Sequence, residues 1–575
     1  MIKIDNLSVA FDGPEVVRNV SFEIGDGEIL GVVGESGSGK SVTALTLMGL
    51  VAETARVTSG KIYYDDQLLL VAGVPRNRAL YREYQGQKMS MVFQEPMTSL
   101  NPTMKIGAQV EEVLLLHDKK CQDVEIISKK DDAGAIKSAQ DGKALAGEKK
   151  AGKAETDEAK NGIAGFLQER REEKERRRAR VLEALRGVGL KDVEKLLDCY
   201  PHQLSGGMRQ RVMIAMAVIL HPGLIIADEP TTALDVTIQN QIIDLLKKIN
   251  AEQKNSMLFI THDLNLARRL CDRILVMQDG QIVEEGITEE IFGDPRGDYT
   301  KKLISAVPGR TGKKKSSHSL KIKEQKVAAK PLVEVRDLSV YYRENANSLF
   351  GKTVKKCVVH HADFDVYEGE ILGLVGESGC GKTSLSKAIL GLNKMIEGSV
   401  VHHSNSPQMV FQDPYGSLNP TKTVGWLLQE PLRAQGVLDP SKAMTEKDRI
   451  AAAHDMLSKI GMKEKYFNRR PSQLSGGQRQ RISIGQALIT HPGLVIADEP
   501  VSALDVTIQA QILELIRSLQ EELKTSFLFI SHDINVIYQV SDRIMVMKDG
   551  KILEIGETED VFAHPKDAYT KELLR

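Results

Sequence analysis

Short aliphatic runs followed by glycine-rich or polar stretches divide this chain into alternating strand and helix patterns. The run EILGVV at 28–33 predicts a strand, and VTALTLMGL at 42–50 suits a helix. The runs LIIAD at 224–228 and LVIAD at 494–498 predict buried strands. Strands that alternate with helices in this way indicate an α/β fold.

Two further segments carry Asp-Gly between apolar runs. They are RILVMQDGQIVEEG at 273–286 and RIMVMKDGKILEIG at 543–556. Asp-Gly in this setting is typical of a tight β-hairpin. Each segment therefore predicts an antiparallel portion within its part of the fold.

The patterns recur because the chain contains a duplication. The recurring pairs are GESGSGKS at 34–41 with GESGCGKT at 376–383, MVFQEPMTSLNP at 91–102 with MVFQDPYGSLNP at 409–420, QLSGGMRQR at 203–211 with QLSGGQRQR at 473–481, LIIADEPTTALDVTIQ at 224–239 with LVIADEPVSALDVTIQ at 494–509, and FITHD at 259–263 with FISHD at 529–533. Repeats of this order indicate two copies of one domain. We expect a first domain at 1–308, a linker at 309–331 and a second domain at 332–575.

The two copies differ in length on either side of the glutamine motif. Lys40 and Gln94 are 54 residues apart, whereas Lys382 and Gln412 are 30 apart. From Gln94 to Ser205 the separation is 111 residues, against 63 in the second copy. The first copy therefore carries an insertion after its glutamine, and the second is short between 383 and 411.

The insertion, at about 118–165, is rich in Lys, Asp, Glu, Ala and Gly and nearly free of aromatic residues. Such a segment buries too little apolar surface to offset its ordering entropy, which favours a disordered surface loop, with a dedicated binding role as the alternative. Residues 166–186 predict a helix with a solvated charged face. The lysines of the 309–331 segment fit a linker, and a membrane-surface contact is the alternative.

The glycine loops carry the first candidate chemistry. A strand, then GxxxxGK[ST], then a helix is the context of a phosphate-binding P-loop, whose backbone N–H groups and helix N-terminus hold phosphates. Lys40 and Lys382 then pair with the β- and γ-phosphates, and Ser41 and Thr383 supply a hydroxyl to Mg²⁺. The residues expected to bind ATP are Gly34, Ser36, Gly37, Ser38, Gly39, Lys40, Ser41 and Val42, and Gly376, Ser378, Gly379, Cys380, Gly381, Lys382, Thr383 and Ser384.

Paired carboxylates end the two aliphatic strands. Asp228 and Asp498 are placed near the metal, and the adjacent Glu229 and Glu499 can accept a proton from an attacking water. An isolated Asp-Glu pair is more often a solvated turn, but here it is repeated after a buried strand.

The LSGG motifs open a second pair of predicted helices. Ser205 and Ser475 lie 23 residues before Asp228 and Asp498. A simple helix N-cap is the alternative reading of each serine.

Together these motifs resemble the ABC ATPase superfamily, and the resemblance covers nearly the whole chain. LSGG upstream of the strand-end Asp-Glu pair separates that family from other P-loop enzymes. The resemblance implies an α/β chain of two P-loop NTPase domains of the ABC type. Each would have a RecA-like core, an antiparallel β portion and an α-helical signature subdomain.

The resemblance also implies composite ATP sites. The domains would meet head to tail, so that Lys40 faces Ser475 and Lys382 faces Ser205. The signature residues expected at ATP are Ser205, Gly206 and Gly207, and Ser475, Gly476 and Gly477. Asp235 and Asp505 would lie at the domain interface.

Further residues receive roles from the same resemblance. Gln94 and Gln412 would sit at the metal and the attacking water, and His262 and His532 at the γ-phosphate. Phe11 and Tyr342 stand where the family places an aromatic ring against adenine, with a core aromatic as the alternative. Cys380 occupies a position used through its backbone, so we expect no redox role for it.

Finer features are similar to the importer branch that handles peptides, nickel and related solutes. The motifs FQ(E/D)PxxSLNP and ALDVTIQ are typical of it, as are the tails DPRGDYTKKLISAVP at 294–308 and HPKDAYTKELLR at 564–575. Some relatives place a cysteine cluster after that tail. None follows Pro308, so we expect no iron–sulfur centre.

Composition narrows the range of partners and cellular locations that we expect. The 575 residues are 41% hydrophobic and 27% charged with a formal net charge of -1, which gives no electrostatic footprint of a nucleic-acid binder. No apolar run approaches the roughly 20 residues of a membrane span, and Val212 to Leu220 reads as a buried core helix. With no visible export signal and five unpaired-looking cysteines, we expect a chain at the cytoplasmic face of the membrane, bound there through partners.

The sequence therefore predicts the ATPase subunit that energises a solute importer. Its expected cofactors are ATP and Mg²⁺. Its expected partners are two transmembrane permease subunits and an extracytoplasmic solute-binding protein. The alternative from another class is a soluble twin-ABC translation factor acting on the ribosome, which also carries an insertion in its first copy. An exporter motor is disfavoured by the tail motif and by the absence of fused spans.

Overall fold

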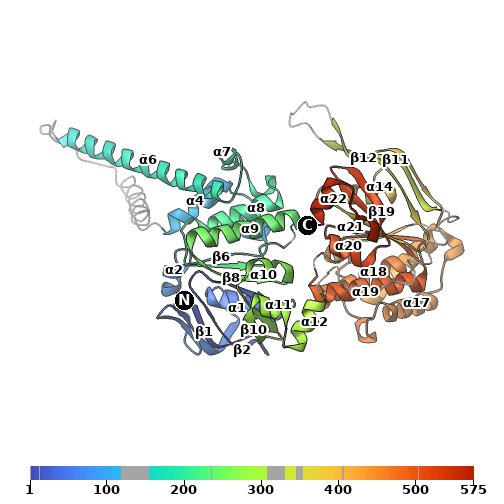
Figure 1. Ribbon diagram of the computed structural model, residues 1–575, viewed down its shortest axis with the longest axis horizontal. Helices are drawn as coiled ribbons and strands as arrows, with labels where there is room; N and C mark the ends of the chain where they lie inside the picture. Colours follow the sequence, from blue (N-terminus) through green and yellow to red (C-terminus); the bar gives the residue numbers. More distant parts are fainter. Residues whose placement is uncertain are drawn as a thin grey trace, which may run out of the picture. The chain divides into compact units, whose positions relative to one another are not determined.

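The computed structural model describes residues 2–11, 13–117, 155–232, 234, 236–306, 331–344, 354–404, 407–502 and 504–574. The chain forms two compact units, one of Met1–Leu234 and Ile238–Lys301, the other of Asp235–Thr237 and Lys302–Arg575 (Figure 1). The expected linker lies outside the described residues except for Pro331, which opens a strand.

A six-stranded sheet forms the centre of the first unit. Its strands, in spatial order, are β10 (Gln281–Ile287), β9 (Arg273–Gln278), β3 (Ile29–Val33), β8 (Ser256–Thr261), β7 (Leu224–Asp228) and β6 (Met89–Val92). All neighbours are parallel except β9 and β10. Strands β3, β7 and β8 are buried along their whole length, as continuous aliphatic runs require.

A second, antiparallel sheet covers the first helix of this unit. Its order is β2 (Glu15–Ile24), β1 (Ile2–Phe11), β4 (Ala55–Tyr64) and β5 (Gln67–Val71). Helix α1 (Lys40–Leu47) shares a buried core with both sheets, in which Leu7, Leu47 and Leu258 are almost fully excluded from solvent. The P-loop helix is therefore fixed between two sheets by apolar packing.

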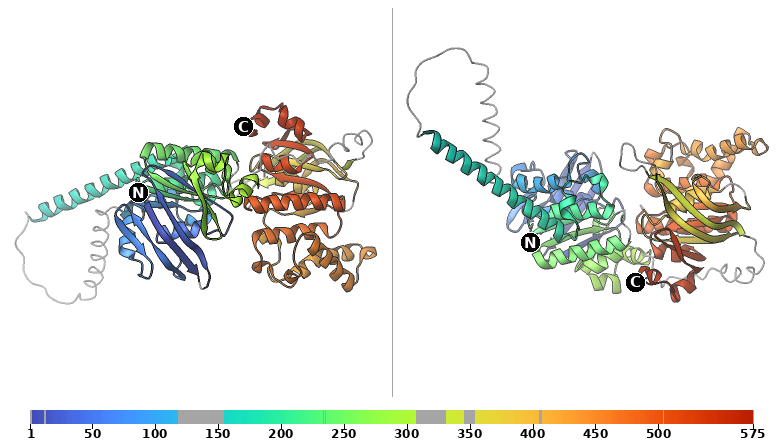
Figure 2. Two further views of the ribbon diagram at one scale, coloured as in Figure 1. Left: turned by 60° about the horizontal axis from the view of Figure 1, so that its bottom comes forward. Right: turned by 90° about the horizontal axis from the view of Figure 1, so that it is seen from above.

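Helices α4 (Ile106–His117), α6 (Glu155–Gly187) and α8 (Gly206–Val218) pack against one another to form the helical part of this unit. Helix α6 extends away from the rest of its unit (Figures 1 and 2). The predicted helix at 166–186 is confirmed, but the helix begins at Glu155, so the expected loop was wrong for residues 155–165. Residues 118–154 of the insertion lie outside the described residues.

The remaining helices of the first unit connect these layers. They are α2 (Arg78–Tyr84), α3 (Pro96–Ser99), α7 (Val193–Leu196), the 3₁₀ turn η1 (Pro201–Gln203), α9 (Val236–Gln253), α10 (Leu264–Leu270), α11 (Thr288–Gly293) and α12 (Asp298–Ala306). Within the described part of the chain, none of the helices has both the length and the apolar character that crossing a bilayer requires.

The second unit repeats the central sheet. Its order is β15 (Gln408–Val410), β16 (Leu494–Asp498), β17 (Ser526–Ser531), β13 (Ile371–Val375), β18 (Arg543–Lys548) and β19 (Lys551–Glu557). Its helices and 3₁₀ turns are α14 (Lys382–Ile389), α15 (Pro414–Ser417), α16 (Val424–Leu438), η2 (Pro440–Lys442), α17 (Glu446–Lys459), η3 (Glu464–Tyr466), η4 (Pro471–Gln473), α18 (Gly476–Leu488), α19 (Val506–Leu523), α20 (Ile534–Val540), α21 (Thr558–Ala563) and α22 (Ala568–Leu573).

The short stretch after the second P-loop removes one strand and one helix. The antiparallel sheet here has three strands, β12 (Val354–Tyr367), β11 (Pro331–Glu344) and β14 (Ile396–His402), with no counterpart of β5 or α2 among the described residues. Strand β14 is thus an edge strand.

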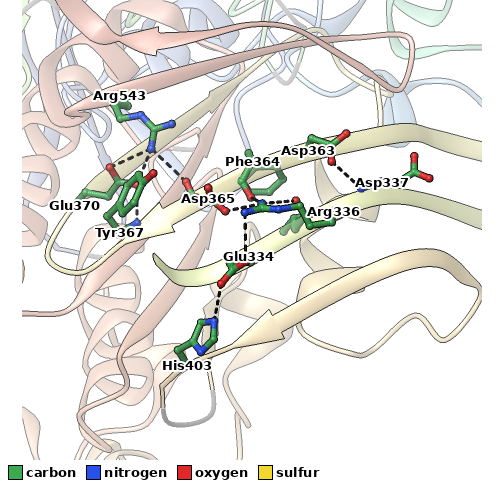
Figure 3. A network of polar contacts seen from close by, with 11 residues as sticks. Glu334, Arg336, Asp337, Asp363, Phe364, Asp365, Tyr367, Glu370, His403 and Arg543 are labelled. Carbon is green, nitrogen blue, oxygen red and sulfur yellow. Dashed lines mark hydrogen bonds and ion pairs between the residues drawn. The ribbon is translucent and has the colours of Figure 1, made fainter. Parts of the chain in front are cut away.

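Polar side chains tie this shortened sheet together (Figure 3). His403, just after β14, lies 2.9 Å from Glu334 on β11, and Arg336 joins Glu334 to Asp365 on β12 at 3.3 and 2.6 Å. Arg543 extends the network to the carbonyl of Asp365, at 3.2 Å. Charged groups of this kind protect a sheet edge from pairing with other chains.

Both predicted hairpins are present, β9–β10 and β18–β19. Asp279 and Gly280 have φ values of 48° and 83°, and Asp549 and Gly550 have 47° and 78°. Two positive φ values in succession are the mark of a type I′ turn. Each hairpin continues the edge of the central sheet, while the separate β1–β2 and β11–β12 sheets supply most of the antiparallel pairing.

Candidate active site

Each P-loop joins a buried strand to the helix that follows it. In the first unit the loop leaves β3 at Gly34 and enters α1 at Lys40. A Cβ atom on Gly34 would stand 2.2 Å from the carbonyl oxygen of Met277, and one on Gly376 would stand 2.1 Å from that of Met547. Only glycine permits this close approach, which fixes where the loop begins.

The P-loop lysines are buried and bonded to the loop itself. Lys40 Nζ donates to the carbonyl oxygens of Gly34 and Glu35, both at 2.8 Å. Lys382 Nζ does the same with Gly376 at 2.7 Å and Glu377 at 2.8 Å. Each ammonium group is therefore held inside the loop, beside the N-terminus of a helix that favours anions.

A hydroxyl and a carboxylate meet beside each lysine. Ser41 Oγ donates to Asp228 Oδ1 at 3.0 Å. Burial raises the pKa of Asp228 to about 6, against the lowering effect of the Ser41 hydrogen bond. Burial likewise raises the pKa of Asp498, which receives a hydrogen bond from Thr383.

These groups fit Mg²⁺. A buried carboxylate with an adjacent hydroxyl offers the oxygen ligands that Mg²⁺ prefers, and a cation there would favour the ionised form that burial disfavours. In the described part of the chain, no group of three or more His, Cys, Asp or Glu residues is placed to hold a metal ion.

The catalytic glutamate candidates receive several donors at one oxygen. Glu229 Oε2 lies 2.9 Å from Gln94 Nε2, 3.1 Å from His262 Nδ1 and 3.1 Å from Thr232 Oγ1. These residues come from three separated parts of the sequence, at 94, 229–232 and 262, so the fold assembles the cluster. Hydrogen bonds to the ionised form of a carboxylate favour that form.

The second unit repeats the cluster with one donor fewer at the carboxylate. Glu499 Oε2 lies 3.0 Å from Gln412 Nε2 and 3.1 Å from His532 Nδ1. Ser502, which corresponds to Thr232, donates instead to the backbone carbonyl of Glu499 at 3.1 Å. The carboxylate that would accept a proton is thus held by fewer side chains in this unit.

Charge within each cluster keeps the glutamates ionised. Burial alone would raise the pKa of Glu229 and of Glu499, but the paired histidine and the P-loop lysine outweigh it, and both pKa values lie below normal. Burial would lower the pKa of His262 and His532, but their glutamate partners outweigh it and raise both. A glutamate that stays ionised near neutral pH can act as a base.

The backbone of both glutamates is in the left-handed region, with φ of 45° at Glu229 and 46° at Glu499. This conformation is unfavourable for a residue with a side chain, and it concentrates at functional sites. The Glu229 N–H donates to the carbonyl of Ile260 at 2.9 Å, and the Glu499 N–H to that of Ile530 at 3.0 Å. The neighbouring strand thus holds each glutamate in place. The sequence contains no signal for this conformation.

The signature serines are exposed and cap the helices that follow. Ser205 Oγ accepts from the Met208 N–H at 3.3 Å, and Ser475 Oγ accepts from the Gln478 N–H at 3.4 Å. The next two glycines, Gly206–Gly207 and Gly476–Gly477, form the first turns of α8 and α18. The capping role predicted as the alternative is therefore present, and it leaves the composite-site role a prediction.

The other predicted residues lie around these clusters or outside them. Phe11, at the end of β1, is half-buried against the core, whereas Tyr342 on β11 is 38% exposed. Asp505 caps α19, since its Oδ1 accepts from the Ile508 N–H at 3.0 Å. Asp235 lies outside the described residues. Cys380 is buried, and burial raises the pKa of its thiol, which suits the absence of a redox role.

Two tyrosines at the P-loops were not expected from the sequence. Tyr299 on α12 and Tyr569 on α22 each accept a hydrogen bond from a P-loop backbone N–H, that of Glu35 at 3.3 Å and that of Glu377 at 3.1 Å. The available signal was the Tyr-Thr pair that recurs in both tails.

Comparison with known proteins gives two matching family models and a set of relatives. The model of the ABC transporter family matches residues 17–232 and 359–502. The model of the oligopeptide/dipeptide transporter C-terminal region matches residues 283–331. The glutathione import ATP-binding protein GsiA of Pectobacterium atrosepticum is 38% identical over 613 residues, covering 100% of this chain and 89% of that protein. The protein of the same name from Escherichia coli strain K12 is 37% identical over 615 residues, with the same coverage.

A solved structure shares the double arrangement at low identity. The archaeal ribosome recycling factor aABCE1, in complex with the stalk protein aP1, gives a TM-score of 0.57 at 19% identity, covering 96% of this chain and 90% of that chain. At this identity the likeness shows the fold alone, and the translation-factor alternative receives less support than the importer.

The fold and the duplicated cluster define a P-loop ATPase with two sites on one polypeptide. With family models matching both copies and relatives matching along its whole length, the chain belongs to the ABC transporter family. Within that family it is the ATP-hydrolysing, energy-coupling subunit of an importer.

Proposed function

We propose that each unit binds one MgATP through its P-loop. The loop amides and the helix N-terminus hold the β- and γ-phosphates, and Lys40 and Lys382 bond to them in place of part of their contacts with the loop. Ser41 with Asp228, and Thr383 with Asp498, hold Mg²⁺, together with Gln94 and Gln412. The metal supplies charge neutralisation on the transferred phosphoryl group.

Glu229 and Glu499 act as general bases toward the attacking water. The observation that carries this role is the carboxylate cluster itself, in which Gln94 and His262 both donate to one oxygen of Glu229 at 2.9 and 3.1 Å. The proton leaves the water for the glutamate as the oxygen attacks the γ-phosphate in line, and His262 and His532 contact the phosphate oxygens. No covalent intermediate on the protein is required.

Glu229→Gln combined with Glu499→Gln tests this assignment. The amide keeps the size and the hydrogen-bond acceptor but cannot take a proton, so we expect turnover to fall by about 10²–10⁴ while ATP binding persists. Steady-state phosphate release and equilibrium nucleotide binding measure the two effects. Glu252→Gln, an exposed glutamate on α9, is the control. Wild-type turnover of the double variant would remove both residues from the mechanism.

The chain works at the cytoplasmic face of the membrane as a peripheral subunit. Two transmembrane permease subunits would receive its conformational change near the glutamine motifs, and an extracytoplasmic binding protein would deliver the solute. Support comes from the match to the ABC transporter and oligopeptide/dipeptide transporter family models.

The transported solute is a short peptide, with glutathione as the first candidate. The relatives named for glutathione import and the matched oligopeptide/dipeptide transporter region support this class. The test is ATP-dependent uptake by the complex reconstituted with its co-purified membrane partners. The labelled panel contains glutathione, dipeptides, longer peptides and Ni²⁺. Uptake of Ni²⁺ without any peptide would overturn the assignment.

A further inference from the structure

The last helix of each unit reaches the start of the P-loop. Tyr299, at the beginning of α12, accepts a hydrogen bond from the Glu35 N–H at 3.3 Å, and Tyr569 on α22 accepts one from the Glu377 N–H at 3.1 Å. The two tyrosines are 270 residues apart, the same spacing that separates the two LSGG serines. The contact is therefore a duplicated feature of the domain.

The bonded N–H belongs to the same peptide group that the P-loop lysine contacts. In the first unit the peptide between Gly34 and Glu35 donates its N–H to Tyr299, while its carbonyl oxygen accepts from Lys40 Nζ at 2.8 Å. The peptide between Gly376 and Glu377 is bonded in the same way by Tyr569 and Lys382. A hydroxyl and an ammonium thus hold opposite ends of one peptide plane, and bonds in such chains strengthen one another.

The turn before each tyrosine is itself fixed by a carboxylate. Glu284 on β10 accepts from the backbone N–H groups of Arg296 at 2.7 Å and Gly297 at 3.0 Å. Glu554 on β19 accepts from those of Lys566 at 3.0 Å and Asp567 at 3.2 Å. The tail therefore reaches the P-loop from a fixed start on the hairpin of its own unit.

The two anchors differ in burial and in the residue that corresponds to Lys548. Tyr569 is 5% exposed, and Lys548 Nζ lies 4.2 Å from the centre of its ring. The residue that corresponds to Lys548 in the first unit is Gln278, which carries no charge, and Tyr299 is only half-buried. A cation over an aromatic face adds attraction that a neutral amide does not supply.

We propose that Tyr299 and Tyr569 are positioning residues that hold the P-loops ready for nucleotide, so that the C-terminal helix of each unit sets its affinity for ATP. The hydroxyl holds the first peptide group of the loop, and through it the lysine ammonium, in the conformation that binds phosphate. When the hydroxyl is removed, the loop occupies this arrangement for a smaller fraction of the time, and the apparent Kd rises by the same factor.

The test uses Tyr299→Phe, Tyr569→Phe and the double variant in the full-length protein, with equilibrium binding of ATP as the readout. Phenylalanine keeps the ring and removes only the hydroxyl, and one hydrogen bond corresponds to about a 2- to 10-fold change in affinity. We expect each variant to raise the Kd at its own site by about this factor. The KM for ATP rises while kcat stays within about 2-fold.

Tyr64→Phe is the matched control, because Tyr64 also bonds to a backbone group, the Lys88 carbonyl at 3.3 Å, away from the P-loop. It leaves the Kd unchanged. Glu284→Gln and Glu554→Gln, which keep both tyrosines but weaken the turn before them, raise the Kd in the same direction. Two results would overturn the proposal. One is a wild-type Kd in both tyrosine variants, and the other is a lowered Tm with unchanged ATP affinity, which marks a purely structural contact.

Discussion

At the scale of single residues, the site places side by side two carboxyl groups whose pKa values are shifted in opposite directions. Asp228 is raised in pKa by burial, while its neighbour Glu229 is held below the normal range by His262 and Lys40. Two adjacent carboxylates with separated pKa values suit different tasks, one as a ligand that awaits a cation and the other as an ionised base. In the protein without nucleotide, the ionised Asp228 carboxylate therefore lowers the stability of the fold, as is common for groups that are retained for function.

This gives a pH-dependent prediction for Asp228→Asn. The folded pKa, about 6, is above the ordinary value of 3.8, so between these pH values the folded chain binds more protons than the unfolded chain. Stability from this group is therefore full below about pH 4 and is lost as the pH rises through 6. We expect the variant without nucleotide to be about 1–3 kcal/mol more stable than wild type at pH 7.5, and unchanged at pH 4.

Thermal melting at the two pH values measures this difference, as a Tm higher by roughly 2–8 °C at pH 7.5 only. The control is Asp244→Asn, which removes the charge of an exposed aspartate on α9. The idea fails if Asp228→Asn shifts the Tm equally at both pH values or lowers it at pH 7.5.

At the scale of elements, the β9–β10 hairpin turn supports the P-loop. The Gly280 N–H donates to the Ser38 carbonyl at 3.2 Å, and the Arg18 N–H donates to the Gly280 carbonyl at 2.8 Å. The same turn in the second unit joins Gly550 to Cys380 at 2.9 Å. The Asp-Gly dipeptide, which the sequence marks only as a hairpin turn, therefore also positions the phosphate-binding loop.

Gly280→Ala, compared with Gly73→Ala, tests whether Gly280 is needed for its close contact as well as for its positive φ. Its Cβ would stand 2.3 Å from the carbonyl oxygen of Val16 on β2, so the turn must move away from β2, which disturbs its hydrogen bond to the Ser38 carbonyl. We expect a loss of about 2–4 kcal/mol in unfolding free energy and weaker ATP binding. Gly73→Ala is the matched control, since Gly73 has a similar φ of 77° with no atom within 4 Å, and costs about 1–2 kcal/mol. Equal losses in the two variants would contradict the contact.

Local patterns explain how much of the fold the sequence predicted. The strands at 29–33, 224–228 and 494–498 and both hairpins follow from apolar runs and turn residues that act within a few positions. The predicted start of α6 was wrong, because residues 155–165 were judged only by how little apolar surface they could bury. A helix needs only local hydrogen bonds, and one nucleated at 166–187 extends cheaply into the Glu, Ala and Lys residues before it.

Contacts between distant residues explain what the sequence did not predict. The bond between Tyr299 and Glu35 joins residues 264 positions apart, and its geometry exists only once the tail has packed. The left-handed backbone of Glu229 depends in the same way on its bond to Ile260, on a neighbouring strand. The types of the candidate catalytic residues follow from motifs, whereas their orientation follows from tertiary packing.

At the scale of the whole molecule, the two copies have the same candidate site residues but differ in some of the residues and elements around them. The second unit lacks the counterparts of β5 and α2 among its described residues, has Ser502 where the first has Thr232, and adds Lys548 beneath its tail tyrosine. The exchange of Thr232 for Ser502 removes one donor to the glutamate carboxylate, whereas the other two differences lie outside that cluster. The residues predicted to hydrolyse ATP are present in both copies, while the affinities of the two sites for ATP are free to differ.

The last prediction tests the head-to-tail arrangement that the family implies. If the first P-loop faces the second signature, Ser475→Glu places a negative charge against the nucleotide at Lys40, whereas Ser205→Glu affects the nucleotide at Lys382. In a Glu499→Gln background only the site of Glu229 can hydrolyse, so its activity is measured alone. Single-turnover phosphate release then reports on that site even where the two sites are coupled.

We expect Ser475→Glu to slow this release by about 10-fold or more, because like charges at close range in a partly buried site disfavour the bound triphosphate. Ser205→Glu has the smaller effect in this background, and the order of the two variants reverses when Glu229→Gln replaces Glu499→Gln. That reversal is the control, since a general loss of folding affects both backgrounds alike. A larger effect of Ser205→Glu at the site of Glu229 would mean that each unit completes its own site, and the composite arrangement would be wrong.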